Sequence, residues 1–253
     1  MKRRIPGLLG LCILAASVVA CVPAAPAAQG QTAAPKPATT PKPATTAHST
    51  TPRTTSMTSD PALLHPATLT AKAPAEYDVK FATSKGDVII HVTRSWAPIG
   101  ADRLYNLVKH GYFTDAPFFR VVPGFMIQFG ISANPAVNAA WKNTNLKDDP
   151  VTQSNKPGYL TFATAGPNTR TTQLFINFGS NAFLDGQGFA PLGQVTTGMD
   201  IVQSLYAGYG EQPDQGALTS QGKAYVDKSF PKLDVIKTAS IVAPAAAPAA
   251  PAH

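Results

Sequence analysis

The alternation of apolar and polar residues predicts a β-hairpin near the middle of the chain. Tyr77–Phe81 alternates between the two classes, and so does Val88–Val92. A period of two is typical of a strand that buries one face. The Ser-Lys-Gly sequence at 84–86 favours a tight turn between the two segments. We therefore expect two antiparallel strands joined by this turn.

Helical spacing and further short strands follow the hairpin. Apolar residues recur at intervals of three and four between Ala97 and His110, and Gly111 follows as a candidate C-cap. A second helix is predicted around Met199–Tyr206. Further strands are predicted at Arg120–Val122, Phe125–Phe129, Tyr159–Phe162, Leu174–Asn177 and Leu233–Val242. Many short strands with two helices are typical of a closed β-barrel capped by helices.

The N-terminal residues have the pattern of an export leader. Three basic residues at positions 2–4 precede an apolar run from Ile5 to Val22, as in secretory signals. The sequence Val-Val-Ala-Cys21 resembles a bacterial lipobox, so we expect residues 1–20 to be a lipoprotein signal peptide and Cys21 to carry the lipid. Cleavage at Ala25-Pro-Ala27 and an uncleaved membrane anchor are the alternatives. We therefore expect an exported protein of the cell envelope, held to a membrane by lipid.

Proline, threonine and alanine are abundant in residues 21–76, where Pro-Lys-Pro-Ala-Thr-Thr at 35–40 repeats at 41–46. This composition buries too little apolar area to offset the entropy of ordering, so we expect a disordered linker. The linker is interpreted as a spacer; contact with the cell wall, or sugars on the threonines, is the alternative. Residues 243–253 are nearly all alanine and proline, so we expect a disordered tail there. This leaves residues 77–242 as one folded domain.

The net charge of +7 is concentrated outside the expected domain. From Glu76 onward the chain has 14 Lys and Arg against 13 Asp and Glu. Because nucleic-acid binding needs clustered basic residues, we expect no nucleic-acid partner. The two cysteines, Cys12 and Cys21, lie in the N-terminal apolar stretch. We therefore expect neither a disulfide nor a thiolate metal site in the domain.

The usual constellations of catalytic side chains are absent from residues 77–242. His91 and His110 are the histidines of this segment, and each is interpreted as a surface residue. Gly-x-Ser-x-Gly, phosphate-loop and dinucleotide-binding motifs are absent from the sequence. If the chain is an enzyme, we expect it to work without metal, cofactor or covalent intermediate.

Three segments carry a specific combination of residues. They read Phe118-Phe-Arg-Val-Val-Pro-Gly-Phe-Met-Ile-Gln-Phe-Gly130, Gly158-Tyr-Leu-Thr-Phe-Ala-Thr-Ala-Gly-Pro-Asn-Thr-Arg-Thr-Thr-Gln-Leu-Phe-Ile-Asn177 and Phe183-Leu-Asp-Gly-Gln-Gly-Phe-Ala-Pro-Leu-Gly-Gln-Val195. The run Ala-Gly-Pro-Asn-Thr, followed shortly by Gln-x-Phe-Ile, is the most specific part. In this order the segments resemble the cyclophilin-type peptidyl-prolyl isomerases, and the resemblance extends from about Tyr77 to Val242.

The resemblance implies a closed eight-stranded antiparallel barrel, capped by two α-helices, with an active-site groove on one face. It also implies isomerisation of X-Pro bonds in exported or envelope polypeptides, which assists their folding. The expected partners are proline-containing polypeptides and a membrane, and we expect the chain to be a monomer.

The resemblance assigns candidate roles to individual residues. Arg120 matches the catalytic arginine of the family. The matches to the proline pocket are Phe125, Met126, Phe175 and Leu184. Gln128 and Gln173 match the family's polar groups that contact the peptide or orient the arginine. Ala163, Thr164 and Ala165 match the strand whose backbone pairs with the bound peptide. Phe183 and Phe189 stand near the places of a groove tryptophan and a groove histidine, and both depart from the usual residue.

The chemistry of proline isomerisation agrees with this assignment. Rotation about a peptide bond costs ~18–20 kcal/mol, because amide resonance is lost. The twisted prolyl nitrogen regains a lone pair, and a fixed guanidinium can donate a hydrogen bond to it. The alternatives are a barrel that binds proline segments without turnover and a structural envelope lipoprotein whose linker is the working part. Mere binding does not need the charge of Arg120, which favours an enzyme.

Overall fold

The structure, a computed structural model, describes residues 60–242. Its strands are β1 Glu76–Thr83, β2 Asp87–Thr93, β3 Ala116–Pro117, β4 Arg120–Val122, β5 Met126–Phe129, β6 Tyr159–Phe162, β7 Leu174–Asn177, β8 Pro191–Thr197 and β9 Val235–Val242. Its α-helices are α1 Pro98–Lys109, α2 Pro135–Trp141, α3 Met199–Ser204, α4 Gln215–Gln221 and α5 Lys223–Ser229. Short 3-10 helices lie at η1 Pro61–Leu64, η2 Pro66–Thr68, η3 Arg94–Trp96 and η4 Ala182–Gln187. The predicted leader, Cys21, most of the linker and the tail lie outside the described residues.

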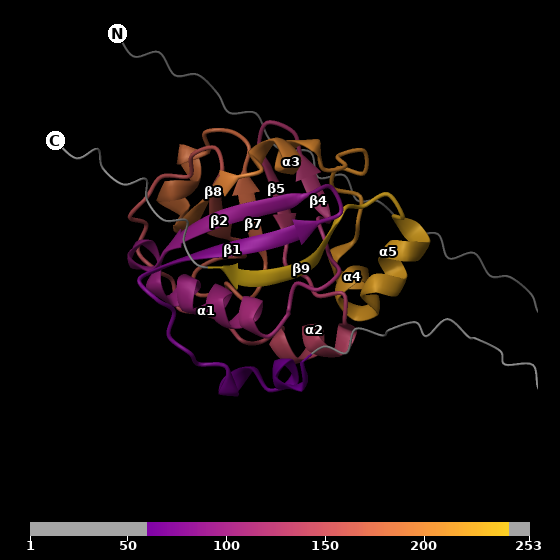
Figure 1. Cartoon of the computed structure of the whole chain (residues 1–253), viewed down its shortest axis with the longest axis horizontal. Coiled ribbons are helices and arrows are strands. Elements are labelled where there is room, and N and C mark those ends of the chain that lie inside the picture. Colours follow the sequence, from indigo (N-terminus) through magenta and orange to yellow (C-terminus); the bar gives the residue numbers. More distant parts are fainter. Residues whose placement is uncertain (1–59, 243–253) are drawn as a thin grey trace, which may run out of the picture. The chain divides into compact units, whose positions relative to one another are not determined.

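The strands form one curled antiparallel sheet with the order β3-β9-β1-β2-β8-β6-β7-β5-β4. In Figure 1, β1, β2 and β9 lie in front of β5 and β7, so the sheet curls back on itself. The predicted hairpin is confirmed, because β1 pairs with β2 and the register places Tyr77 opposite Val92. The predicted strand at Tyr159–Phe162 is also confirmed, as β6.

The expected closed eight-stranded barrel is wrong: the sheet has nine strands and is a curled half-barrel. Its edge strands β3 and β4 follow one another in the chain but pair with different neighbours, β9 and β5 respectively. Pro117 ends β3, and the amide of Phe118 makes the last hydrogen bond to this side of the sheet, at the carbonyl of Asp234 just before β9. Beyond it the amide of Val121 donates to the carbonyl of Gly210, which lies on a loop. The two edges are therefore not joined to each other by a strand ladder.

The core lies inside the curl of the sheet. Phe81, Phe113, Phe118 and Phe129 form edge-to-face contacts with ring centroids 5.4–6.0 Å apart. Such aromatic pairs add stabilisation beyond the burial of their area. Alternate residues of the strands point inward to this core, so the remaining residues of β4, β5 and β7 are directed to the opposite face.

The helices differ in number from the expectation of two. The predicted helix between Ala97 and His110 is confirmed as α1, and the one around Met199–Tyr206 is the shorter α3. Three more, α2, α4 and α5, have seven residues each. They are too short to give a clear hydrophobic period, although Asn134 and Asp214 cap α2 and α4 with side-chain hydrogen bonds. Figure 1 shows α4 and α5 beside each other near β9.

The folded part begins before the expected boundary at Tyr77. Leu63 is 1% exposed and packs in the core. The indole N–H of Trp141 donates to the carbonyl of Leu63 at 2.8 Å, and the amide of Ala73 donates to Asp102 at 2.8 Å. Residues 60–76, which composition assigns to the linker, therefore pack against α1 and α2. Several of these contacts join backbone groups of the segment to side chains of α1 and α2, so they do not depend on the segment's own side chains and leave no mark in its composition.

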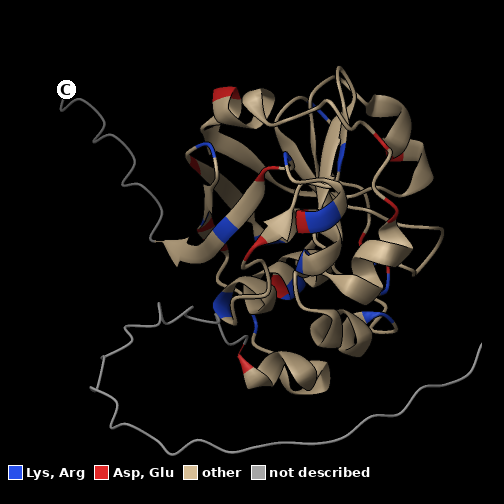
Figure 2. Cartoon of the chain, turned by 90° about the vertical axis from the view of Figure 1, so that its right-hand side faces the viewer, with Lys and Arg blue, Asp and Glu red and all other residues tan. Residues whose placement is uncertain are grey.

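In Figure 2, which colours the ribbon by residue type, positions of Lys and Arg alternate with positions of Asp and Glu along the described part of the chain, and neither kind gathers in one region. Among residues 60–242, none of the helices is long and apolar enough to cross a membrane.

Candidate functional site

Strand register brings the candidate residues together on the outer face of β4, β5 and β7. Arg120 on β4 lies opposite Gln128 on β5, and Gln128 lies opposite Phe175 on β7. Their chain neighbours Val121 and Ile127 belong to the main core instead. Because side chains alternate between the faces of a strand, the core packing of one set directs the other set outward.

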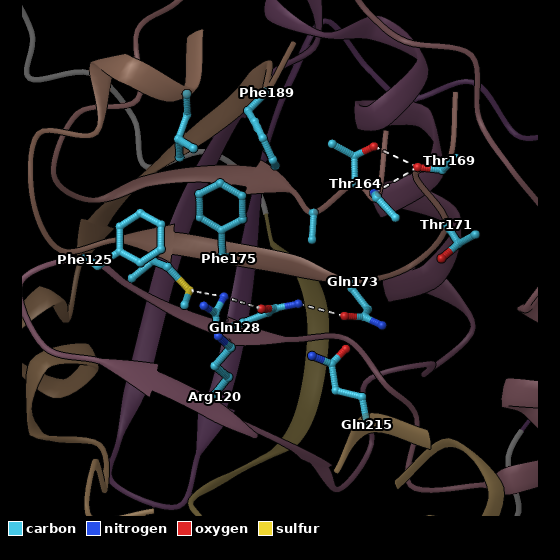
Figure 3. Close-up of a pocket in the computed structure, with 14 residues that line it drawn as sticks. Arg120, Phe125, Gln128, Thr164, Thr169, Thr171, Gln173, Phe175, Phe189 and Gln215 are labelled. Atoms are coloured by element: carbon cyan, nitrogen blue, oxygen red, sulfur yellow. Dashed lines mark hydrogen bonds between the residues drawn. The ribbon is translucent and has the colours of Figure 1, made fainter. Parts of the chain in front are cut away.

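These outward side chains line a pocket of about 370 Å³, shown in Figure 3. Its walls are formed by Arg120, Phe125, Met126, Gln128, Ala163, Thr164, Ala165, Thr169, Thr171, Gln173, Phe175, Leu184, Phe189 and Gln215. Arg120 is the charged residue in this set. All but one of the pocket residues suggested by the sequence are therefore brought to the same cavity.

The apolar wall of the pocket is a small cluster separate from the main core. Met126, Phe175 and Leu184 are 2%, 4% and 6% exposed and contact one another, with Phe125 and Phe189 packed against them. The rings of Phe175 and Phe189 meet edge to face at 5.8 Å. A concave apolar surface with a few polar groups beside it is typical of a small ligand site.

A row of polar side chains runs directly beside this apolar wall. The Nη1 group of Arg120 donates to Gln128 Oε1 at 3.2 Å, and Gln128 Nε2 donates to Gln173 Oε1 at 2.8 Å. Nη1 also approaches the sulfur of Met126 at 3.9 Å, a weak acceptor. These contacts, drawn in Figure 3, direct Nη1 toward the pocket.

The segment Ala163–Ala165 is a loop after β6 rather than part of a strand. The amide of Ala163 donates to the carbonyl of Gln173, and the amide of Ala165 donates to the hydroxyl of Thr169. Any pairing of this segment with a peptide must therefore use its remaining backbone groups. All three residues of this loop line the pocket.

A hydrogen-bonded carboxylate holds the segment that carries Leu184 and Phe189. Asp185 on η4 accepts from the hydroxyl of Ser154 at 2.5 Å and from the amide of Asn155 at 2.9 Å. Burial raises the pKa of Asp185, but these hydrogen bonds outweigh burial and hold its pKa below the usual value. The side chain of Asn155 also donates to the carbonyl of Phe189 at 2.9 Å. This network fixes one end of the apolar wall.

One expected residue does not line the pocket, and several others were missed. Phe183 is 60% exposed and instead stacks on Phe125, with ring centroids 6.0 Å apart. Thr169 and Thr171 line the pocket and lie within the second quoted segment, so they could have been found there. Gln215, at the start of α4, and Glu211, which contacts Arg120, come from a region without a recognisable pattern.

Within the described part of the chain, no group of three or more His, Cys, Asp or Glu residues could hold a metal ion. The arrangement can bind an apolar ring beside a fixed cationic hydrogen-bond donor.

Comparisons with known proteins agree on one family. The protein-family comparison matches residues 78–221 to "Cyclophilin type peptidyl-prolyl cis-trans isomerase/CLD". A peptidyl-prolyl cis-trans isomerase of Acinetobacter baylyi is 32% identical over 151 residues, which cover 54% of this chain and 76% of that protein. The isomerase cypE of Dictyostelium discoideum is 31% identical over 135 residues, 52% of this chain and 86% of that protein.

Solved structures show the same fold. A cyclophilin-type isomerase of Cryptosporidium parvum matches with a TM-score of 0.50 and 20% identity, over 66% of this chain and 98% of that chain. The same protein in the presence of the dipeptide Ala-Pro matches with a TM-score of 0.51, 20% identity and 66% and 99% coverage.

Proposed function

The chain belongs to the cyclophilin-type peptidyl-prolyl cis-trans isomerase family, and we propose that it isomerises X-Pro bonds of exported polypeptides with Arg120 as the catalytic group. The observation that carries the assignment of Arg120 is the position of its guanidinium, beside an apolar pocket and directed toward it by Gln128.

The pocket fits a prolyl ring. Met126, Phe175 and Leu184 form an apolar surface, and a related cyclophilin has been crystallised in the presence of Ala-Pro. Burial of the ring excludes water from one side of the amide, which strengthens any hydrogen bond made there. Proline-containing segments are therefore the proposed ligands of this site.

Arg120 supplies the stabilisation that the twisted amide needs. The nitrogen gains its lone pair as resonance is lost, so a donor placed beside it binds the transition state more tightly than either planar form. The Nη1 group contacts the weakly accepting sulfur of Met126, and the prolyl nitrogen can replace this contact at little cost. A permanently charged guanidinium makes such a hydrogen bond stronger than a neutral donor would.

The second candidate is a binding module that holds proline segments without turnover. The Arg120–Gln128–Gln173 row favours catalysis, because holding an apolar ring does not require an oriented charge. NMR exchange spectroscopy of an Ala-Pro-Phe peptide with the full chain tests this directly. We expect cis–trans exchange to be accelerated at catalytic concentrations of protein. Peptide binding without acceleration, on several proline peptides, would establish the binding module instead.

We also propose that the protein is exported and anchored at the cell envelope through lipid on Cys21. The basic start, the apolar run and the Val-Val-Ala-Cys21 sequence support this proposal, and two or more acyl chains give stable anchoring where one does not. The repeated Pro/Thr linker would then act as a spacer, and assistance of folding outside the cytoplasm would be the role of the enzyme.

The anchor is tested by Cys21→Ser with cell fractionation and labelling by a fatty-acid analogue. We expect the variant to lose the label and to leave the membrane fraction or to accumulate as precursor. Cys12→Ser is the matched control and should keep both label and location. Unchanged labelling of the Cys21 variant would rule out this anchor.

A further inference from the structure

Glu211 makes the closest charged contact with Arg120. Nε of Arg120 donates to Glu211 Oε1 at 2.5 Å, and Nη2 lies in ion-pair contact with the same oxygen. Glu211 does not line the pocket. The carboxylate therefore holds one edge of the guanidinium while Gln128 holds the Nη1 group on the pocket side.

The loop that carries Glu211 is attached directly beside Arg120. The amide of Val121, the next residue after Arg120, donates to the carbonyl of Gly210 at 3.0 Å. Tyr209, which precedes Gly210 in the chain, packs its ring edge to face against the ring of Phe230, with the ring centroids 5.0 Å apart. Two hydrogen-bonded turns, Gly210 to Ala207 and Gln212 to Tyr209, close the loop. The position of Glu211 is thus set by β4 and by aromatic packing, not by the ion pair alone.

The ion pair adds little to folding stability but much to orientation. Arg120 and Glu211 side chains are 30% and 60% exposed, and exposed pairs of this kind contribute little to stability. Arginine, however, has a long flexible stem, and its planar fork fixes a direction when two of its nitrogens are held. We propose that Glu211 is a positioning residue, which holds Arg120 with its Nη1 group turned toward the proline pocket. This rests on the proposed function of Arg120.

Glu211 could also have the opposite effect and lower the activity of Arg120. A carboxylate beside the guanidinium also draws its donors away from the substrate and neutralises its charge. If that effect were the larger, removal of Glu211 would raise the rate of isomerisation. The geometry favours positioning, because Glu211 contacts Nε and Nη2, and the Nη1 group stays on the pocket side.

The experiment compares Glu211→Ala and Glu211→Gln in the full chain, with Glu76→Gln as the control for loss of one exposed glutamate on β1. We expect kcat on an Ala-Pro-Phe peptide to fall about three- to tenfold in Glu211→Ala, with KM nearly unchanged. Glu211→Gln should recover part of the loss, because its amide oxygen can still accept from Nε. In an Arg120→Ala background, Glu211→Ala should have no further effect, since it acts through Arg120.

NMR of the arginine side chain provides a readout independent of activity. The Nε–H signal of Arg120, assigned by its loss in Arg120→Lys, should exchange slowly with water and exchange faster in Glu211→Ala. Equal or greater activity of Glu211→Ala, or unchanged exchange of this signal, would overturn the positioning role. If the unsubstituted protein isomerises no proline peptide, the proposed function fails, and the exchange of the Nε–H still decides whether Glu211 orders the guanidinium.

Discussion

At the scale of single residues, the polar row beside the pocket sets the direction of one guanidinium. Gln128 lies between Arg120 and Gln173 and connects them through its amide. Residues of this row come from β4, from β5 and from the approach to β7, so the sheet register determines their spacing.

We predict that Gln128→Leu lowers kcat/KM by about tenfold or more. The substitution keeps the approximate volume but removes the acceptor for a charged donor, and such hydrogen bonds contribute about 1.5–3 kcal/mol. Isomerisation of a proline peptide by the full chain gives the measurement. Gln221→Leu, an exposed residue at the end of α4, is the control and should retain normal activity. Normal activity of Gln128→Leu would show that the row does not orient Arg120.

The pocket residues could largely be named from the sequence, because they lie in segments whose order resembles a known family. Phe183 shows the limit of that reasoning, since it shares such a segment and yet is exposed beside Phe125 rather than in the pocket. Glu211 and Gln215 reach the site through loop and helix positions far from Arg120 in sequence. No local pattern marks such residues; their places follow from tertiary packing.

At the scale of elements, hydrophobic period predicted the hairpin and α1 but not the contacts that complete them. The N-cap residue of α1, Ala97, has no side chain that can cap the helix. Asp149 takes this role, accepting from the amides of Ile99 and Gly100 at 2.9 Å each, and it pairs with the buried Arg170 at 3.0 Å. A cap supplied from some 50 residues away leaves no signal at the helix itself.

The N-terminal segment gives a prediction at this scale. Leu63→Ala should lower the free energy of unfolding by about 2–5 kcal/mol, because a fully buried leucine leaves a cavity when truncated. Leu64→Ala is the matched control, since Leu64 is 46% exposed, and its effect should stay within about 0.5 kcal/mol. Urea unfolding of both variants makes the comparison. Equal stability of the two would mean that residues 60–76 do not belong to the cooperative fold.

At the scale of the whole molecule, carboxylates whose pKa is lowered by their hydrogen-bond partners predict that the fold loses stability at low pH. The pKa of Asp60 is lowered by its hydrogen bond to His110, and that of Asp102 is lowered because hydrogen bonds from Arg94 and Ala73 outweigh its burial. The pKa of Asp185 is also lowered, because hydrogen bonds from Ser154 and Asn155 outweigh its burial. A carboxyl whose pKa is lower in the folded state stabilises the fold above its unfolded pKa, and this contribution is lost as pH falls through the folded pKa.

The urea midpoint should therefore fall as the pH is lowered from about 5 toward 2, around and below the unfolded value of 3.8. Asp102→Asn should lose part of this dependence, whereas the exposed substitution Asp200→Asn should keep it. A midpoint that stays constant or rises on acidification would contradict these linkages.

The fold as a whole was predicted only in outline. A mostly β cyclophilin-like architecture follows from the resemblance, but the partner switch between β3 and β4 opens the expected barrel. At that switch the amide of Val121 donates to the carbonyl of Gly210 on a distant loop, a contact that strand patterns do not reveal.

The catalytic role of Arg120 is the central claim, and the cis-to-trans rate of an Ala-Pro-Phe peptide with Arg120→Ala in the full chain tests it most directly. Loss of a charged donor to the transition state should cost about 3–4 kcal/mol, or roughly a hundredfold or more in rate. Arg120→Lys should be almost as slow, because an ammonium lacks the planar fork. Circular dichroism and peptide affinity should stay close to those of the unsubstituted protein. A folded alanine variant that keeps more than about a third of the normal rate would show that Arg120 is not the catalyst.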